Sequence, residues 1–259
     1  MSKIFNIVRI DSIFSKNFNR YFLYVLGEIV LVVIGILIAL QINNQNKIQE
    51  AKKKEILYLQ SFQEDLRKDI GLIKDQLEAK EFLFSQLEEV FHEFPDLQYR
   101  SEEELLEISN RLALITSQFN FVCSCSTFEA IQNSSDIQVI TDFSLVQSLF
   151  NYYTFSHIIS THDDLSNQYI RNIVEPYIFE KLELRSIDYI SDWYENDNRK
   201  FEKRLSDIYS DYQFENILIG TRDRTEAYLA IYKRALMLAQ ELYVRLDEKI
   251  SARIDYETH

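Results

Sequence analysis

The chain has 259 residues and a formal net charge of −13, and Cys123 and Cys125 are its only cysteines. Two cysteines are too few for a disulfide framework or a four-thiolate zinc site, and an acidic chain disfavours nucleic-acid binding because phosphate backbones repel it. Only four glycines and two prolines occur, so turn-forming residues are scarce and long helices are expected.

Residues 1–20 combine four basic residues with several large apolar ones. This mixture is typical of a short amphipathic helix on an anionic membrane surface. The alternative is a signal peptide, with residues 1–20 as its basic region. The next apolar run is too long for that, and no small-residue cleavage site follows it at Ala39-Leu40-Gln41. We therefore expect an uncleaved signal-anchor.

Residues 21–42 read YFLYVLGEIVLVVIGILIALQI, in which Glu28 and Gln41 are the only strongly polar residues. As a helix this segment would span about 33 Å, slightly more than the roughly 30 Å hydrocarbon core of a bilayer. We predict one transmembrane helix here, in contact with the lipid bilayer. The remaining residues, 43–259, carry a net charge of −15 and are expected to form one acidic helical domain.

The orientation of this helix rests on the basic residues beside it. Lys16 and Arg20 lie immediately before the apolar run, whereas neutral residues 43–46 follow it. Four lysines at residues 47–54 bring the two sides close to a tie. We expect the N-terminus in the cytoplasm and the acidic domain outside it.

One face of the predicted transmembrane helix is unusual. Separations of 7 and 11 residues place Glu28, Gly35 and Ala39 on one side, with Leu31 beside them. The small pair Gly35-x-x-x-Ala39 allows a second helix to approach closely. A carboxylate in this position costs several kcal/mol unless it is protonated, paired or able to reach water. The interpretations are pairing with a partner helix or a second copy, an unpartnered carboxyl group, or a proton relay.

Residues 48–94 contain no proline and are expected to form a long helix that ends before Pro95. Apolar residues follow a 4-3-4-3 spacing, interrupted only by Gln63 and Lys80, which is typical of a coiled coil. The residues of this stripe are Leu59, Leu66, Ile70, Ile73, Leu77, Phe84, Leu87 and Phe91.

Helices of varied length are expected in the middle of the chain. A capping box at Ser101 starts one, and residues 127–131 form a short second one. Thr141 or Asp142 caps a long helix that runs to about residue 175, where Pro176 is expected to stop it. Residues 177–197 are predicted to form one or two short helices.

The last predicted helix covers residues 211–254 and matches the helix of residues 48–94 in period and approximate length. We therefore predict an all-α fold in which these two long helices pack antiparallel as a stalk, with a small helical bundle between them in the sequence. The stripe of the last helix is Phe214, Leu218, Thr221, Thr225, Tyr228, Tyr232, Ala235, Ala239, Leu242 and Leu246.

Few residues suggest a metal or catalytic site. Glu89-x-x-His92 is half of a di-iron ligand pattern whose second copy is absent. His157 and His162 are expected as hydrogen-bonded core or boundary residues rather than ligands. Cys123 and Cys125 are interpreted as small packing residues, with a disulfide or half of a metal site as alternatives. No nucleophile or phosphate-binding motif is present, so no enzyme activity, cofactor or metal is expected.

The segment YFLYVLGEIVLVVIGILIALQINN, residues 21–44, resembles the signature of a family of uncharacterised single-pass membrane proteins common in the Bacteroidetes lineage. A second segment, residues 127–136, resembles a weaker part of the same pattern, and Gln45 stands where family members commonly have Trp. The resemblance implies a membrane-anchored helical protein, and with the orientation given above we expect it in the bacterial inner membrane with its acidic domain in the periplasm. It also marks Glu28 as part of a shared motif, and it implies no activity.

Two functions are compatible with these features. The first is a noncatalytic, membrane-anchored scaffold or partner subunit that forms a homo-oligomer or binds another membrane protein through the face of Glu28, Leu31, Gly35 and Ala39. The second is an extracytoplasmic sensor that binds a small ligand through the aromatic-rich residues 143–177 and signals through a partner protein. A membrane-tethered enzyme ranks third because no catalytic motif supports it.

Overall fold

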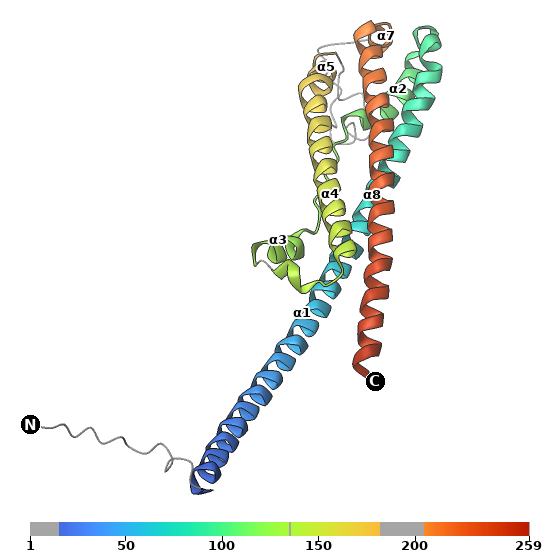
Figure 1. Ribbon diagram of the computed structural model, residues 1–259. Helices are drawn as coiled ribbons and strands as arrows, with labels where there is room; N and C mark the ends of the chain where they lie inside the picture. Colours follow the sequence, from blue (N-terminus) through green and yellow to red (C-terminus); the bar gives the residue numbers. More distant parts are fainter. Residues whose placement is uncertain (1–15, 135, 182–204, 259) are drawn as a thin grey trace, which may run out of the picture. The chain divides into compact units, whose positions relative to one another are not determined.

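The computed structural model describes residues 16–134, 136–181 and 205–258, and all regular structure in these ranges is helical (Figure 1). This confirms the all-α fold class. The chain divides into two compact units, Met1–Glu55 and Ile56–His259. The boundary predicted after residue 42 therefore falls inside unit 1 and stays a prediction. The amphipathic segment expected before residue 16, and most of the short helices expected over residues 177–197, lie outside the described residues.

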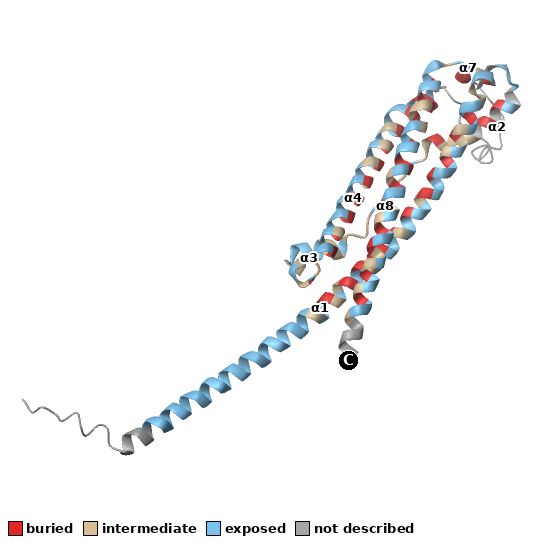
Figure 2. Ribbon diagram, turned by 45° about the vertical axis from the view of Figure 1, so that its right-hand side comes forward, coloured by how far each residue is buried: buried red, intermediate tan, exposed pale blue. Residues whose placement is uncertain are grey.

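Helix α1, Lys16–Glu93, contains both the apolar run and the first predicted stalk helix, which we expected as two separate helices. No glycine or proline separates the two, and Asn and Gln are tolerated in a helix, so nothing interrupts the backbone hydrogen bonds. In unit 1, every described side chain from residue 22 to residue 51 is exposed (Figure 2). The large apolar side chains of residues 22–42 are 38–79% exposed.

The remaining helices follow the predicted order. Helix α1 ends at Glu93, immediately before Phe94-Pro95, as predicted. Ser101 and Glu104 form the expected capping box, and Asp142 caps the long middle helix by accepting a hydrogen bond from the Leu145 N–H at 3.1 Å. The elements are η2 Phe94–Tyr99, α2 Glu102–Leu112, η3 Ala113–Thr116, α3 Ser126–Asn133, η4 Asp136–Val139, α4 Phe143–Tyr169, η5 Ile170–Val174, α5 Glu175–Lys181, α7 Leu205–Tyr209 and α8 Tyr212–Thr258.

In unit 2, α1 and α8 run antiparallel, as the paired contacts between them show. Gln63 donates to Asp247 at 2.9 Å, and Lys233 pairs with Glu81 at 2.9 Å. Residue numbers thus rise along α1 as they fall along α8. The predicted antiparallel arrangement of the two long helices is therefore present in this unit.

Helix α4 completes a three-helix core in unit 2 (Figure 1). Its contacts with α1 join Asp69 to Tyr152 and Lys80 to Asp163, and both pairs are 83 residues apart, so α4 runs parallel to α1. The middle of the chain therefore packs alongside the two long helices. Red, buried positions face inward along all three (Figure 2).

The buried face of α8 agrees fully with the sequence pattern, because all ten predicted stripe residues are buried. The stripe of α1 agrees less well. Phe91 is 38% exposed and Val90 is buried in its place. At this end, Leu83, Leu87 and Val90 pack in one cluster with residues of α2 and η2, so the local partners turn the buried face away from Phe91.

Pro176 does not stop the helix, so that prediction is wrong. Segment η5 is a π-helix, and at its end the Glu175 N–H donates to the Ile170 carbonyl, five residues earlier. Pro176 then lies in the first turn of α5. A proline is tolerated there because the first N–H groups of a helical segment have no acceptor within it.

Glycine substitutions test the packing of α8 against α4. A Cβ atom added at Gly220 would lie 2.8 Å from the Tyr169 hydroxyl oxygen, whereas one added at Gly71 meets no atom within 4 Å. Gly220→Ala is expected to lower the free energy of unfolding by about 1–3 kcal/mol because the tyrosine must move. The control, Gly71→Ala, is expected to raise it by about 0.5–1 kcal/mol. Urea unfolding of the detergent-solubilised chain measures both, and a stabilising Gly220→Ala would contradict the packing argument.

Candidate functional site

The four residues predicted as a transmembrane packing face lie on α1 within unit 1. Glu28, Leu31, Gly35 and Ala39 are all exposed, and a Cβ added at Gly35 meets no atom within 4 Å. By length and composition α1 is apolar enough to cross a membrane, a criterion that signal sequences also meet. The role of this face stays a prediction.

The described histidines, His92, His157 and His162, belong to no group of metal-ligating side chains. His92 is exposed, and Glu89 pairs with Arg111 at 3.1 Å instead. His157 is exposed, so its expected core or boundary position is wrong; apolar residues occur on two sides of α4 and made the buried face ambiguous. His162 is half-buried with its ring edge against Tyr228, which confirms a boundary position. Across the part of the chain that the structure describes, no group of three metal-ligating side chains occurs.

Cys123 and Cys125 form a disulfide in the structure. Both are also partly buried against the apolar core of unit 2. The interpretation as simple packing residues was therefore incomplete, and the disulfide alternative is the one that the structure contains. A spacing of two residues alone does not distinguish paired from unpaired thiols.

The chemically distinctive part of unit 2 is a buried ion pair between α1 and α4. Lys80 Nζ lies 3.4 Å from Asp163 Oδ1, and the two side chains are 3% and 0% exposed. Three aromatic rings surround the ammonium group, with centroids 4.0 Å away for Phe119, 4.8 Å for Tyr232 and 4.9 Å for Tyr228. Burial lowers the pKa of Lys80, while the charge of Asp163 opposes the shift. The ring faces stabilise the cation that remains.

Asp163 also binds α8 and the segment between η3 and α3. Its second oxygen accepts hydrogen bonds from the Tyr232 hydroxyl and, at 2.9 Å, from the Phe121 N–H. Burial raises the pKa of Tyr232, and the neighbouring carboxylate adds to that shift, so the phenol stays a proton donor. A single carboxylate thus joins α1, α4, α8 and this connecting segment.

We call residues 117–125 the strap, because they run between η3 and α3 without helical structure. Asn167 accepts a hydrogen bond from the Phe119 N–H at 3.2 Å and donates one to the Phe119 carbonyl at 2.7 Å. Asp69 accepts from the Ser124 N–H at 2.8 Å and from the Tyr152 hydroxyl at 2.7 Å. Buried polar side chains therefore supply the partners that strap backbone groups would otherwise lack.

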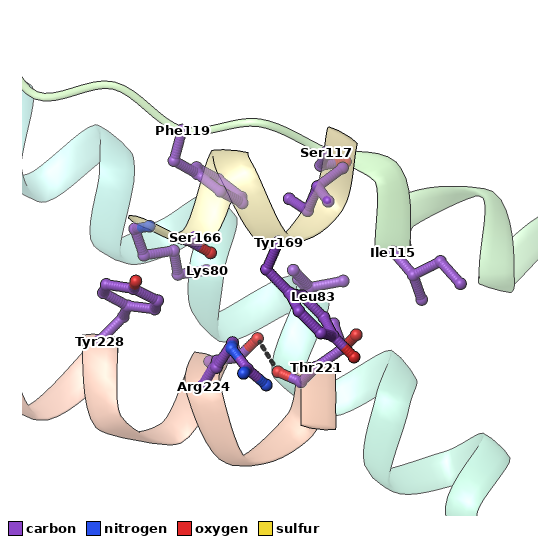
Figure 3. Close-up of a pocket in the computed structure, with 12 residues that line it drawn as sticks. Lys80, Leu83, Ile115, Ser117, Phe119, Ser166, Tyr169, Thr221, Arg224 and Tyr228 are labelled. Carbon is purple, nitrogen blue, oxygen red and sulfur yellow. Dashed lines mark hydrogen bonds between the residues drawn. The ribbon is translucent and has the colours of Figure 1, made fainter. Parts of the chain in front are cut away.

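A small pocket lies beside the ion pair and is lined by α1, η3, the strap, α4, η5 and α8 (Figure 3). Its volume is about 20 Å³, enough for one water-sized occupant. Lys80 and Arg224 are the charged residues that line it, and both are basic. Ser117 and Ser166 add hydroxyl groups, and Tyr169 forms part of the wall.

Arg224 is positioned at this pocket by Tyr169 and Gly220. Its guanidinium carbon lies 3.8 Å from the centroid of the Tyr169 ring, and its Nη1 donates to the Gly220 carbonyl at 2.9 Å. The missing Cβ of Gly220 makes the close approach of Tyr169 possible. Among the described residues, no carboxylate pairs with Arg224, and its side chain is exposed.

Sequence reasoning missed this network. Lys80 appeared only as an interruption of the apolar stripe, and Asp163 was not singled out at all. The available signal was that Lys80 falls at a core position of the heptad; Asp69 lies beside such a position, one residue before Ile70. A charged residue at such a position indicates a buried partner, but the pattern does not identify the partner.

Breaking the buried pair is expected to cost far more stability than breaking an exposed one. Asp163→Asn leaves the Lys80 ammonium group buried without a counter-charge, which costs about 3–5 kcal/mol. Adding Lys80→Met is expected to recover part of this loss. The control Glu81→Gln breaks the exposed pair with Lys233 and costs about 1 kcal/mol or less. Equal costs in chemical denaturation of Asp163→Asn and Glu81→Gln would contradict a buried charge pair.

Asp69 gives a pH-dependent prediction. Burial raises its pKa above the ordinary aspartate value, although the hydrogen bonds from Tyr152 and Ser124 oppose the shift. The folded state therefore holds the proton to higher pH than the unfolded state. Its contribution to stability is complete below the unfolded pKa of about 3.9 and is lost as the pH rises through the folded value.

The variant Asp69→Asn lacks this titration but keeps an oxygen that accepts from Ser124. The free energy of unfolding of Asp69→Asn minus that of the unmodified chain is therefore expected to increase as the pH rises from 4 to 7, because only the unmodified chain loses stability over this range. Asp142→Asn is the control. The pKa of Asp142 is lowered to about 2, chiefly by the Ser144 and Leu145 hydrogen bonds, so the pH dependence that this substitution removes lies below pH 4. A difference for Asp69→Asn that stays constant with pH would contradict the raised pKa.

Comparison with known proteins places the chain in a family without assigning an activity. No curated protein and no solved structure matches it. A family model described as "Family of unknown function (DUF6090)" matches residues 28–182, which include Glu28, Lys80, the strap and Asp163. Because this match covers more than half of its length, the chain belongs to the family of unknown function DUF6090.

Proposed function

We propose that this protein is a noncatalytic, membrane-anchored subunit that acts as a scaffold or partner in a membrane assembly. The observation that carries the proposal is the continuous exposure of the apolar side chains of residues 22–42. An exposed apolar surface of this length is stable in water only when lipid or protein covers it. A helix of about 21 residues matches the thickness of a bilayer core.

The proposed location is the bacterial inner membrane, with the N-terminus in the cytoplasm and unit 2 in the periplasm. Lys16 and Arg20 before the apolar run support this orientation. The disulfide between Cys123 and Cys125 is a second support, because disulfides persist in oxidising compartments such as the periplasm.

The proposed interface of the assembly is the face of Glu28, Leu31, Gly35 and Ala39. Successive helix residues are about 100° apart, so these four side chains lie within about 80° of one another and Leu37 lies opposite to them. Gly35 and Ala39 allow backbones to come close, and Glu28 then bonds to the other helix instead of facing lipid alone. The occupant we propose is a second copy of this chain, with another membrane protein as the alternative.

Substitutions in this face test the proposal in native membranes. Gly35→Ile adds bulk at the contact and Glu28→Leu removes its polar group, so each is expected to reduce crosslinked dimers several-fold. The matched control is Leu37→Ile on the opposite side, which leaves crosslinking unchanged. If both face variants crosslink as the unmodified chain does, the interface is elsewhere. If dimers are absent from the start, co-purification from detergent extracts asks whether another membrane protein binds this face.

A second candidate function is a sensor that binds a small ligand in unit 2 and signals through a partner protein. The specific observation in its favour is the pocket beside Lys80, because Ser166, Tyr169 and Ile170 contribute to it from the aromatic-rich residues 143–177. The pocket is small, so any ligand that enters it whole is of similar size.

A further inference from the structure

We infer that the pocket lined by Lys80 and Arg224 is a binding site for a small monovalent anion, either a halide ion or the carboxylate group of a small acid. This inference deepens the sensing alternative and rests on it for biological meaning. The binding itself depends only on unit 2. The membrane-assembly proposal is independent of it.

The charge of the pocket is the first argument. The charged side chains that line it are both cations, in a protein whose net charge is −13. Asp163 balances Lys80 at 3.4 Å. The guanidinium group of Arg224 has no carboxylate partner in the described ranges, since it contacts the Tyr169 ring and the Gly220 carbonyl. One positive charge therefore remains at the pocket.

The donors that remain are the second argument. Thr221 and Thr225 donate their hydroxyl protons to carbonyls one turn earlier in α8, and Tyr228 donates to the His162 carbonyl. These groups are already used. Lys80 has three N–H bonds and one carboxylate acceptor, and Arg224 has further N–H bonds beyond the one to Gly220. Ser117, Ser166 and Tyr169 add neutral hydroxyl donors, but the charged donors at this pocket are all cationic, which favours an anionic occupant over a neutral one.

The size and backbone of the site are the third argument. A volume of about 20 Å³ holds one water-sized group, so one halide ion or one carboxylate oxygen enters it, whereas phosphate and sulfate are too large to enter whole. The wall includes Ile170, the first residue of the π-helix η5. Single π-helical turns within α-helices are rare and occur often at functional sites, so a second feature of the fold coincides with the pocket.

The test measures chloride binding to the full chain in detergent by the NMR line width of chloride, titrated at constant ionic strength with a bulky sulfonate such as 2-(N-morpholino)ethanesulfonate. Saturable broadening is expected. Arg224→Gln removes the unpaired cation and is expected to weaken binding about tenfold, the loss of one charge-assisted hydrogen bond. Arg234→Gln is the matched control, because Arg234 is an exposed arginine of the same helix that does not line the pocket. It changes the net charge equally and is expected to leave binding unchanged.

Competition identifies the source of the anion. Displacement of chloride by formate or acetate supports a carboxylate ligand, and resistance to both supports a halide. Stronger displacement by phosphate or sulfate would overturn the size argument. Broadening that does not saturate, or that falls equally in Arg224→Gln and Arg234→Gln, would overturn the site and leave a pocket filled by water. None of these outcomes changes the crosslinking expected for Gly35→Ile, so the two proposals fail separately.

Discussion

The burial of the Lys80 ammonium group is the constraint on which the rest of unit 2 depends. A cation that is only 3% exposed must be compensated from within the protein, and the compensation comes from Asp163 on α4. Asp163 in turn binds Tyr232 on α8, so three helices are held in one register by a single polar cluster. A buried ion pair adds little net stability compared with apolar packing. It does penalise every register that separates its charges, and it therefore specifies how the helices align.

The need of buried polar groups for partners also explains the strap. An extended segment without a neighbouring strand leaves its backbone N–H and C=O groups without regular partners. Here Asp69, Asp163 and Asn167 supply them from α1 and α4, each at a buried position. The acidic composition of the chain therefore has two distinct origins. Most of the described carboxylates are exposed to solvent, but a few are buried and accept hydrogen bonds that a neighbouring strand would otherwise accept. A pattern of apolar residues does not identify those few.

This distinction also explains which features the sequence predicted. The α8 stripe and the Asp142 cap follow from spacing and local hydrogen bonding, which a single segment contains. The burial of Lys80 depends on Asp163, 83 residues away, and no local pattern encodes such a partner. Pro176 misled for a related reason. Its usual effect assumes an unbroken α-helix, whereas the π-helical turn before it changes the pairing of the backbone groups. The cysteine pair and the pocket depend on tertiary packing in the same way.

A cationic pocket in a strongly acidic protein has a consequence for recognition. At long range the net charge of −13 repels anions, and salt screens this repulsion over about 10 Å at ordinary ionic strength. Attraction must then act locally: Arg224 supplies the unbalanced positive charge, and Lys80, shielded from water by Phe119, Tyr228 and Tyr232, adds N–H donors at a lower effective dielectric. Added inert salt should therefore weaken binding less than at an exposed basic patch, since it screens the long-range repulsion as well as the attraction to the exposed Arg224, and it screens the buried contact with Lys80 least. A weak dependence of binding on salt therefore distinguishes a specific anion site from the general attraction of a basic surface.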